Sequence, residues 1–139
     1  MQPIRVLTPQ LDILAEIDDY ESLAWARRWH RPGEFQLHIN RHKQNTDTLQ
    51  KGNLVLAGSK VGIIRHRELV QGARGRGEEQ VTIKGLTPAS IVGRRITIPP
   101  TGYAYDRVSA AAETITKGYV TRNCITPTDP KRAIPNLIV

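Results

Sequence analysis

The sequence predicts a mainly β protein of the α+β class: an antiparallel small barrel or curled sheet, with one or two short helices in the C-terminal third. Two observations predict the sheet. Residues 18–40 alternate apolar and polar side chains on both sides of a Pro-Gly pair, as paired, half-buried strands do. Similar alternating runs continue to about residue 85. A third observation predicts a helix, because Val108, Ala112, Ile115 and Tyr119 recur at helical spacing.

Short turn sequences divide the first part of the chain into seven candidate strands. Gly58 and Ser59 are expected to close a hairpin between two of them. Asp18 and Asp19 predict a turn, because short acidic side chains bond nearby backbone amides. The strands are expected at Ile4–Leu7, Leu11–Ile17, Ser22–His30, Glu34–Asn40, Asn53–Ala57, Lys60–Val70 and Glu79–Lys84, with a loop of at most one helical turn at 41–51.

The third and fourth strands hold both tryptophans and the only phenylalanine of the chain. Trp25 and Trp29 share one face of the third strand, and Phe35 lies on the fourth, beyond Pro32 and Gly33. Large aromatic side chains bury the most area per residue, so we expect these three to fix the core of the first half.

The last third of the chain has a different pattern. Its predicted elements are a short helix over Leu86–Val92, an extended run at Arg94–Ile98 and a longer helix over Val108–Asn123. Thr87 can cap the short helix and Pro88 suits its first position, while Asn123 suits a left-handed helix end. We therefore expect a β scaffold at residues 1–85 and a helix-containing continuation of the same domain at residues 86–139.

Composition narrows the class of partner. Lys and Arg number 20 against 13 Asp and Glu, which gives a net charge of +7 and favours polyanions or acidic protein surfaces. Cys124 is the only cysteine, so no internal disulfide can form, and a reducing compartment such as a cytoplasm is expected. No apolar run reaches the length of a membrane span, and no secretion signal is visible.

Three histidines raise the question of a metal site. His38 and His42 are four residues apart, which suits one face of a helix. The surrounding pattern is that of a strand, where positions four apart are separated by about 13 Å. Neither they nor His30 have a cysteine or well-placed carboxylate nearby to complete a ligand set. The sequence therefore favours histidines on a basic surface, and predicts no metal.

Motifs for catalysis are missing as well. Asp18, Asp19 and Glu21 could pair for acid–base work, but a turn explains the aspartates without further assumptions. Cys124 has no base near it in the sequence, and neither a nucleophile elbow nor a phosphate loop occurs. The glycine-rich GARGRG sequence at 72–77 lies between two strands, the wrong context for a nucleotide. We predict no catalytic or cofactor-binding residues.

The arginines are the candidate functional residues. A positive groove with stacking aromatics is how sheet modules hold single-stranded nucleic acid, and this alternative stays open. The aromatics nevertheless occupy core-like alternating positions, and the sequence signatures of nucleic-acid-binding modules are absent. Arginine also suits protein interfaces. We therefore favour a subunit or partner interface formed by Arg27, Arg28, Arg31, Arg65, Arg67, Arg74 and Arg76.

Three phrases of the sequence resemble a known family. They are the R-x-W-x-R-P-G-E-F-x-L-x-I core that begins at Arg27, the KVGIIRHRE strand that begins at Lys60, and the C-terminal pattern A-E-T-I…Y-V…N…P…D-P…R…I-P-N-L. The chain is similar over nearly its whole length to the siphovirus ReqiPepy-type phage tail protein family, whose members resemble the N-terminal region of tail hub or baseplate proteins.

The resemblance implies a structural function. It implies a tail-tube-like β domain, assembly into a ring of copies with a trimer as the expected size, and contacts with other phage tail proteins. The location implied is the virion tail, assembled in the host cytoplasm. Family members are longer, so this chain is expected to be an N-terminal fragment. Its GARGRG tip at 72–77 also departs from the acidic or neutral tips of the family, and the family carries no catalytic residue onto this sequence.

Overall fold

The computed structural model describes residues 2–70 and 79–139. The chain divides into two compact units, residues 1–90 and residues 91–139. The first unit holds all the strands and the second holds the longer helix. Arg74 and Arg76, and with them the GARGRG tip, lie outside the described residues.

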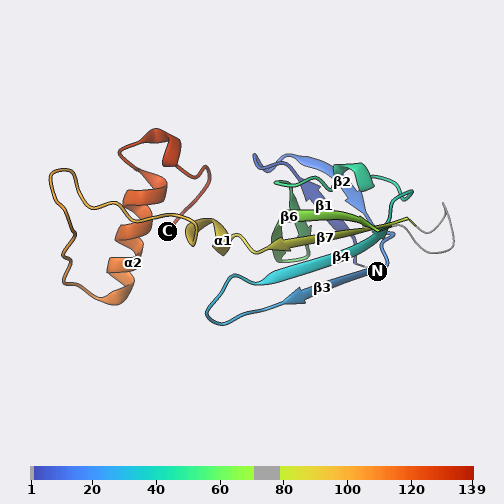
Figure 1. Cartoon of the computed structure of the whole chain (residues 1–139), viewed down its shortest axis with the longest axis horizontal. Helices are drawn as coiled ribbons and strands as arrows, with labels where there is room; N and C mark the ends of the chain where they lie inside the picture. Colours follow the sequence, from blue (N-terminus) through green and yellow to red (C-terminus); the bar gives the residue numbers. More distant parts are fainter. Residues whose placement is uncertain (1, 71–78) are drawn as a thin grey trace. The chain divides into compact units, whose positions relative to one another are not determined.

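The first unit is one antiparallel sheet (Figure 1). Its seven strands have the order β2-β1-β5-β6-β7-β4-β3, and every neighbouring pair is antiparallel. The strands are β1 (Ile4–Leu7), β2 (Ile13–Ile17), β3 (Ser22–Ala26), β4 (Glu34–Asn40), β5 (Leu54–Ala57), β6 (Lys60–Val70) and β7 (Gln80–Leu86). All seven predicted strands are therefore present, and the hairpin around Gly58 is confirmed.

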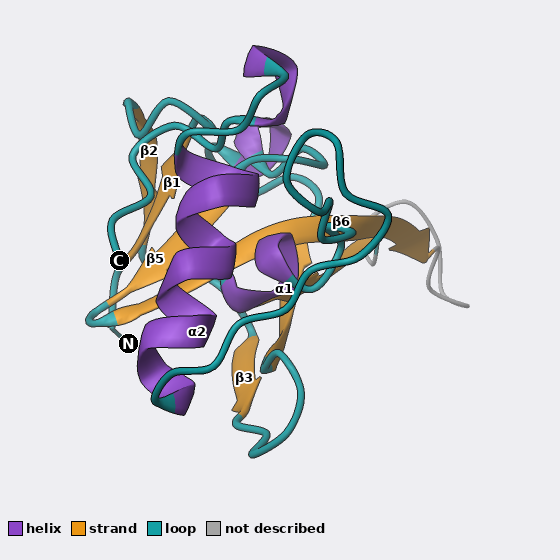
Figure 2. Ribbon diagram, turned by 90° about the vertical axis from the view of Figure 1, so that its left-hand side faces the viewer, coloured by secondary structure: helices purple, strands orange, loops and turns teal. Residues whose placement is uncertain are grey.

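The sheet buries its face by curling on itself (Figure 2). The described residues of this unit contain only single helical turns, so no helix of the unit covers the sheet, and an apolar face must be buried against something. The fully buried side chains come from strands across the whole sheet, among them Ile4, Leu37, Val55 and Ile83. The predicted curled sheet is confirmed, and it is not closed, because β2 and β3 remain edge strands.

Two glycines allow this tight curl. Phe35 is 2% exposed, and its ring lies over Gly62 of β6 and Gly85 of β7. A Cβ at either glycine would come within 2.3 Å of the ring. Trp25 packs on Phe35 with ring centroids 4.9 Å apart. The prediction that aromatics fix the core therefore holds for Trp25 and Phe35.

Trp29 does not follow that prediction. It is 93% exposed, because β3 ends at Ala26, where its register with β4 ends opposite Glu34. Beyond this pair the chain has no partner strand, and the alternation that places Trp25 on the core no longer applies. The expected strand Ser22–His30 was therefore four residues too long.

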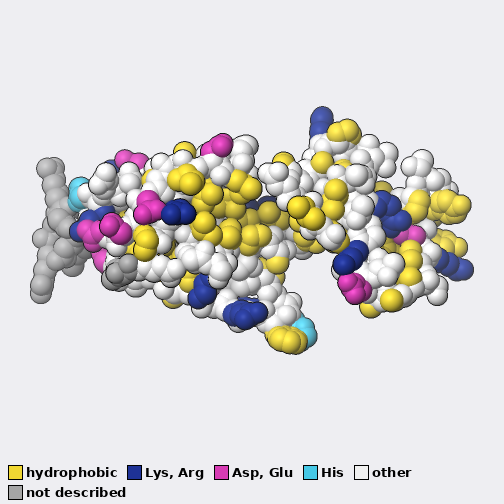
Figure 3. Space-filling view, turned by 180° about the vertical axis from the view of Figure 1, so that it is seen from behind, with side chains coloured by type: hydrophobic (Ala, Val, Ile, Leu, Met, Phe, Trp, Pro, Cys, Tyr) yellow, Lys and Arg dark blue, Asp and Glu magenta, His cyan; other side chains and the backbone are white. Residues whose placement is uncertain are grey.

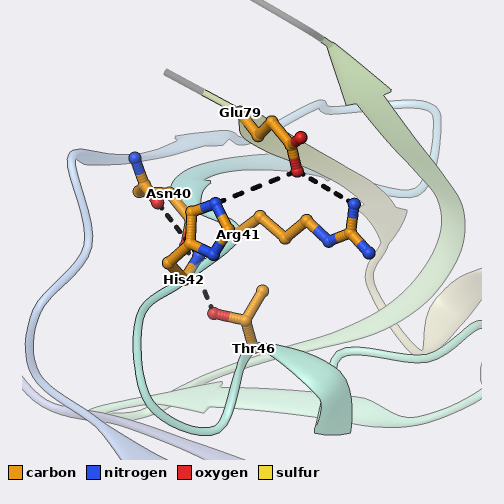
Figure 4. A network of polar contacts seen from close by, with 5 residues as sticks. All are labelled: Asn40, Arg41, His42, Thr46 and Glu79. Carbon is orange, nitrogen blue, oxygen red and sulfur yellow. Dashed lines mark hydrogen bonds and ion pairs between the residues drawn. The ribbon is translucent and has the colours of Figure 1, made fainter. Parts of the chain in front are cut away.

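A polar network fixes the connection between β4 and β5 (Figure 4). Arg41 Nη1 donates to Glu79 Oε2 at 2.9 Å, and the Thr46 hydroxyl donates to the carbonyl of Asn40 at 3.4 Å. The predicted loop contains one 3-10 turn, Thr46–Thr48, after which Leu49 is fully buried. This loop therefore contributes to the core as well as linking two strands.

Asp18 and Asp19 do not form the expected turn. The chain runs without a turn from β2 at one edge of the sheet to β3 at the other. Tyr20 in this connection is 8% exposed, and its hydroxyl donates to the carbonyl of Gln2 at 2.8 Å. The buried tyrosine, rather than turn chemistry, fixes the path of this segment.

The second unit has a small core. Helix α1 (Ala89–Val92) lies at the junction, and α2 (Ala112–Val120) continues into a π-helical turn, Thr121–Ile125, before a 3-10 turn, Pro130–Arg132. Of the described side chains in residues 91–139 only Asn123 and Cys124 are buried. The Asn123 amide accepts from Ile98 N–H at 2.8 Å and donates to the Tyr119 carbonyl at 3.0 Å.

The segment 94–98, expected to be extended, pairs with no strand of the sheet. Two other expectations for this region were wrong. Asn123 is not a left-handed helix end but an interior residue whose side chain is used for packing. Thr87 does not cap α1 with its hydroxyl, which instead accepts from Gly33 N–H. The Thr87 hydroxyl and the Asn123 amide oxygen instead accept hydrogen bonds from backbone groups distant in the sequence.

Candidate interface around strand β3

The β3–β4 loop, residues 27–33, is anchored at one end. Gly33 N–H donates to Thr87 Oγ1 at 3.0 Å, and Thr87 N–H donates to the Gly33 carbonyl at 2.8 Å. A Cβ at Gly33 would lie 2.9 Å from the Ala26 carbonyl oxygen and 3.0 Å from Thr87 Cγ2. Glycine is therefore needed here for close approach, and the anchored loop projects from the sheet (Figure 3).

Three of the predicted interface residues, Arg27, Arg28 and Arg31, lie on this loop and are exposed. Arg28 pairs with Glu34 at 3.3 Å, with both side chains about half exposed. Such a pair contributes at most about 1 kcal/mol. Arg27 and Arg31 make no ion pair with any described residue. The loop therefore carries two cations that a partner can pair with.

Trp29 lies among these arginines. Its ring contacts only His30 among described aromatics, edge-on with centroids 6.4 Å apart. Trp and Arg are the residues that most often carry binding energy in protein interfaces. Burying an indole on a partner removes a large apolar area from water. An exposed Trp flanked by arginines therefore has the composition of an interface anchor.

A groove of about 930 Å³ lies beside the loop. Its walls are the loop itself, the β5–β6 turn at Ser59 and Lys60, and residues 87–89. Lys60 and the three loop arginines line it, together with both tryptophans, and no carboxylate does. The arginine cluster predicted from the sequence is thus extended by Lys60, which is distant in the sequence and which sequence reasoning missed.

A second hollow of about 490 Å³ lies along the same strand. Ala24 and Ala26 of β3 line it, and Arg65 and Lys84 supply its positive charge. Arg65 stands where the β6–β7 register shifts, between Ile64 and His66, and its guanidinium also donates to Ser90 Oγ at 3.4 Å. The structure therefore places Arg65, which belongs to β6, beside β3, the strand that leads into the loop of Arg27, Arg28 and Arg31.

Arg67, by contrast, is exposed further along β6 and lines neither hollow. Because β6 continues past the end of β5, this part of β6 pairs only with β7. The structure thus unites four of the seven predicted arginines around β3, places Arg67 apart from them, and leaves Arg74 and Arg76 outside the described residues.

A second surface is apolar. One row of cross-strand partners on the face opposite the core runs Ile13, Leu7, Leu54, Ile63 and Leu86. Ile13, on the edge strand β2, is 65% exposed, and its neighbour Leu14 is 46% exposed. The outer face of a curled sheet normally carries polar side chains. Ile63, within the row, is only 6% exposed, so the second candidate contact surface is the exposed end of the row at Ile13 on the free edge.

The histidines are placed in separate environments. His38 contacts Gln36 at 2.7 Å and Thr82 at 3.1 Å, while His42 lies 3.9 Å from Glu79 (Figure 4). Among the described residues, no three His, Cys, Asp or Glu side chains come together as a metal set would require.

The acidic residues near β3 are also engaged elsewhere. Asp19 forms an ion pair with Lys43, and Glu21 accepts from Gln80 Nε2. Cys124 is 2% exposed in the second unit. In the described part of the chain no helix has the length and apolar character needed to cross a membrane. The arginine-rich surface around β3 is therefore the best-developed candidate site.

The fold and these surfaces define a mainly β protein with an exposed arginine-rich loop and free sheet edges. The family model described as siphovirus ReqiPepy6 Gp37-like protein matches residues 3–139. The chain belongs to this phage protein family, in agreement with the resemblance seen in the sequence. A comparison with curated proteins finds no match.

Proposed function

We propose that this chain is a structural component of the phage tail, part of the hub or baseplate that links the tail tube to the host-adsorption apparatus. It acts by assembly rather than catalysis. Its partners are copies of itself, arranged as a ring with a trimer as the expected size, and other tail proteins. Membership of the phage family supports this proposal at the level of a phage protein.

One observation carries the proposal. The sheet buries its core within its own curl, while two free edges, the exposed Ile13 on one of them, and an arginine-rich loop face outward. Free edges that expose unpaired backbone groups favour pairing with another chain unless something covers them. Ring formation by head-to-tail contacts can cover such surfaces on every copy.

Labelling of virions tests the location. Antibodies raised against the purified chain and coupled to gold should decorate the tail tip in electron micrographs of the phage that encodes it. Decoration of the capsid, or of no part of the virion, would rule out a hub or baseplate component. Antibodies from the same animal before immunisation provide the control.

Sedimentation of the purified chain tests self-association. Ile13→Lys places a charge on the exposed edge strand and should shift the chain toward monomer. Because Ile13 is 65% exposed, its replacement should change the free energy of unfolding by less than about 0.5 kcal/mol. Gln44→Lys adds the same charge at an exposed loop position and should leave the oligomer unchanged. Equal sedimentation of all three proteins would refute a contact through β2.

A further inference from the structure

We propose that the free edge of β3 binds an extended, acidic segment of a partner protein by strand addition, with the segment's carboxylates reaching cations in the two hollows beside β3. The inference rests on the proposed function, because the same loop is the proposed partner surface, and it adds the chemistry and the geometry of the partner.

The backbone of β3 is available for pairing. Its only neighbour in the sheet is β4, so one side of residues 22–26 has no partner strand among the described residues. The sequence SLAWA contains neither charge nor proline. Charged side chains and prolines are the usual protection of an edge strand against pairing. An unprotected edge of this kind is the template for a peptide that adds as a further strand.

The two hollows lie where the side chains of such a strand would point. Successive side chains of a β-strand point to opposite faces of the sheet. Ala24 lies in register with Gln36 and Lys84 and lines the smaller hollow, whereas Trp25, whose side chain alternates with it, packs on Phe35; Trp25 and Ala26 line both the smaller hollow and the larger groove. An added strand would therefore place side chains beside both hollows, which is how peptides added to a sheet edge gain specificity.

Charge selects an acidic segment. The cations that line the two hollows are Arg27, Arg28, Arg31, Lys60, Arg65 and Lys84. The only carboxylate among the lining residues is Glu34, which is paired with Arg28. Within the described part of the chain, Arg27, Arg31, Lys60 and Lys84 form no ion pair. Carboxylates of a bound segment would pair with the cations of both hollows.

The same surface is less suited to single-stranded nucleic acid. Modules that hold such strands stack successive bases on several aromatic side chains. Among the described aromatics of the first unit, Tyr20 and Phe35 are buried and Trp25 is half-buried against Phe35. Trp29 alone is exposed, and one ring provides an anchor rather than a stacking series.

The binding of synthetic peptides to the full chain tests the proposal. The probe is a fluorescein-labelled peptide of alternating Glu and Val, titrated in fluorescence anisotropy. We expect it to bind, and the matched peptide of alternating Lys and Val not to bind. N-methylation of alternate backbone amides removes donors that strand addition needs, so it should weaken binding by about tenfold or more.

Charge reversals then locate the site. Arg31→Glu alters a cation of the larger groove and Lys84→Glu a cation of the smaller hollow, and each should weaken binding of the Glu-Val peptide by about tenfold. Lys51→Glu makes the same change at an exposed loop position that lines neither hollow and should leave the affinity unchanged. Equal binding of both peptides, or affinity insensitive to N-methylation, would overturn strand addition by an acidic segment.

A third probe separates this inference from its competitor. Binding of an oligo(dT) strand but not of the acidic peptide, lost in Trp29→Ala, would overturn the inference in favour of nucleic acid. Failure of the proposed function is distinguishable: tails labelled by antibody with no peptide binding would leave the tail component intact and sink only strand addition. Peptide binding without tail labelling would support strand addition and refute the tail component.

Discussion

Alanine in place of Gly62 tests how the sheet closes over its core. The added Cβ would lie 2.3 Å from Phe35 Cε1, 2.4 Å from Phe35 Cδ1 and 2.9 Å from Trp25 Cη2. Carbon atoms in contact prefer separations near 3.5 Å, so the Phe35 ring must move by about 1 Å. The ring is 2% exposed and packed against Trp25, so it has little room to move.

The expected cost follows from that displacement. Overpacking of a well-filled core costs about 1–3 kcal/mol. For a domain of this size each kcal/mol lowers the melting temperature by about 4–8 °C. Urea unfolding followed by tryptophan emission is the assay, because both tryptophans lie in the first unit. Gly118→Ala is the control: it lies in the second unit and its added Cβ has nothing within 4 Å, so the tryptophan transition of the first unit should not change.

A second substitution makes the reasoning refutable. Phe35→Leu removes the ring that obstructs Gly62→Ala, so the double variant should be more stable than the two single changes predict, by about 0.5–3 kcal/mol. Phe35→Leu should not restore the stability lost in Gly85→Ala. The Cβ added at residue 85 would also lie 2.2 Å from the Ile63 carbonyl oxygen, a backbone atom that a change of side chain does not remove. An unchanged urea midpoint for Gly62→Ala, or equal relief of both alanines, would contradict this account of the curl.

Two further predictions concern the second unit. Asn123→Ala removes a buried amide that joins Ile98 N–H to the Tyr119 carbonyl, so both backbone groups lose that partner. The change should lower the free energy of unfolding of residues 91–139 by about 1–3 kcal/mol, as measured by loss of helical circular dichroism in urea. Cys124 is 2% exposed, so its thiol should react with a disulfide reagent only when this unit opens. Because that unit buries few side chains, labelling should begin at lower urea than the tryptophan transition of the first unit; simultaneous transitions would contradict this order.

The local alternation of apolar and polar residues was sufficient to predict that the strands exist, but not where each one ends. The alternation from Glu34 to Asn40 predicts β4 residue for residue, because a half-buried strand needs that pattern to face core and solvent together. The same alternation continues through Trp29, although the strand ends at Ala26. A pattern carries no information on where a partner strand stops, and the partner β4 begins only at Glu34.

The candidate site was predictable in part. The arginines of the β3–β4 loop are adjacent in the sequence, so their clustering is local and can be read directly. Lys60, Arg65 and Lys84 join them only through the pairing of β6 with β7 and of β7 with β4. Contacts between residues far apart along the chain depend on strand order, which composition and spacing do not encode.

The sequence by itself determined a mainly β chain with a late helix, an excess of arginine and membership of a phage family. These properties reside in periodicity, charge and motif, each of which is local to a few residues. Only the tertiary structure decided that the sheet stays open, that Trp29 faces solvent while Trp25 packs on Phe35, and that cations from distant strands line two hollows beside β3. The reason is physical: burial and edge exposure depend on which strands become neighbours, and the fold alone sets that order.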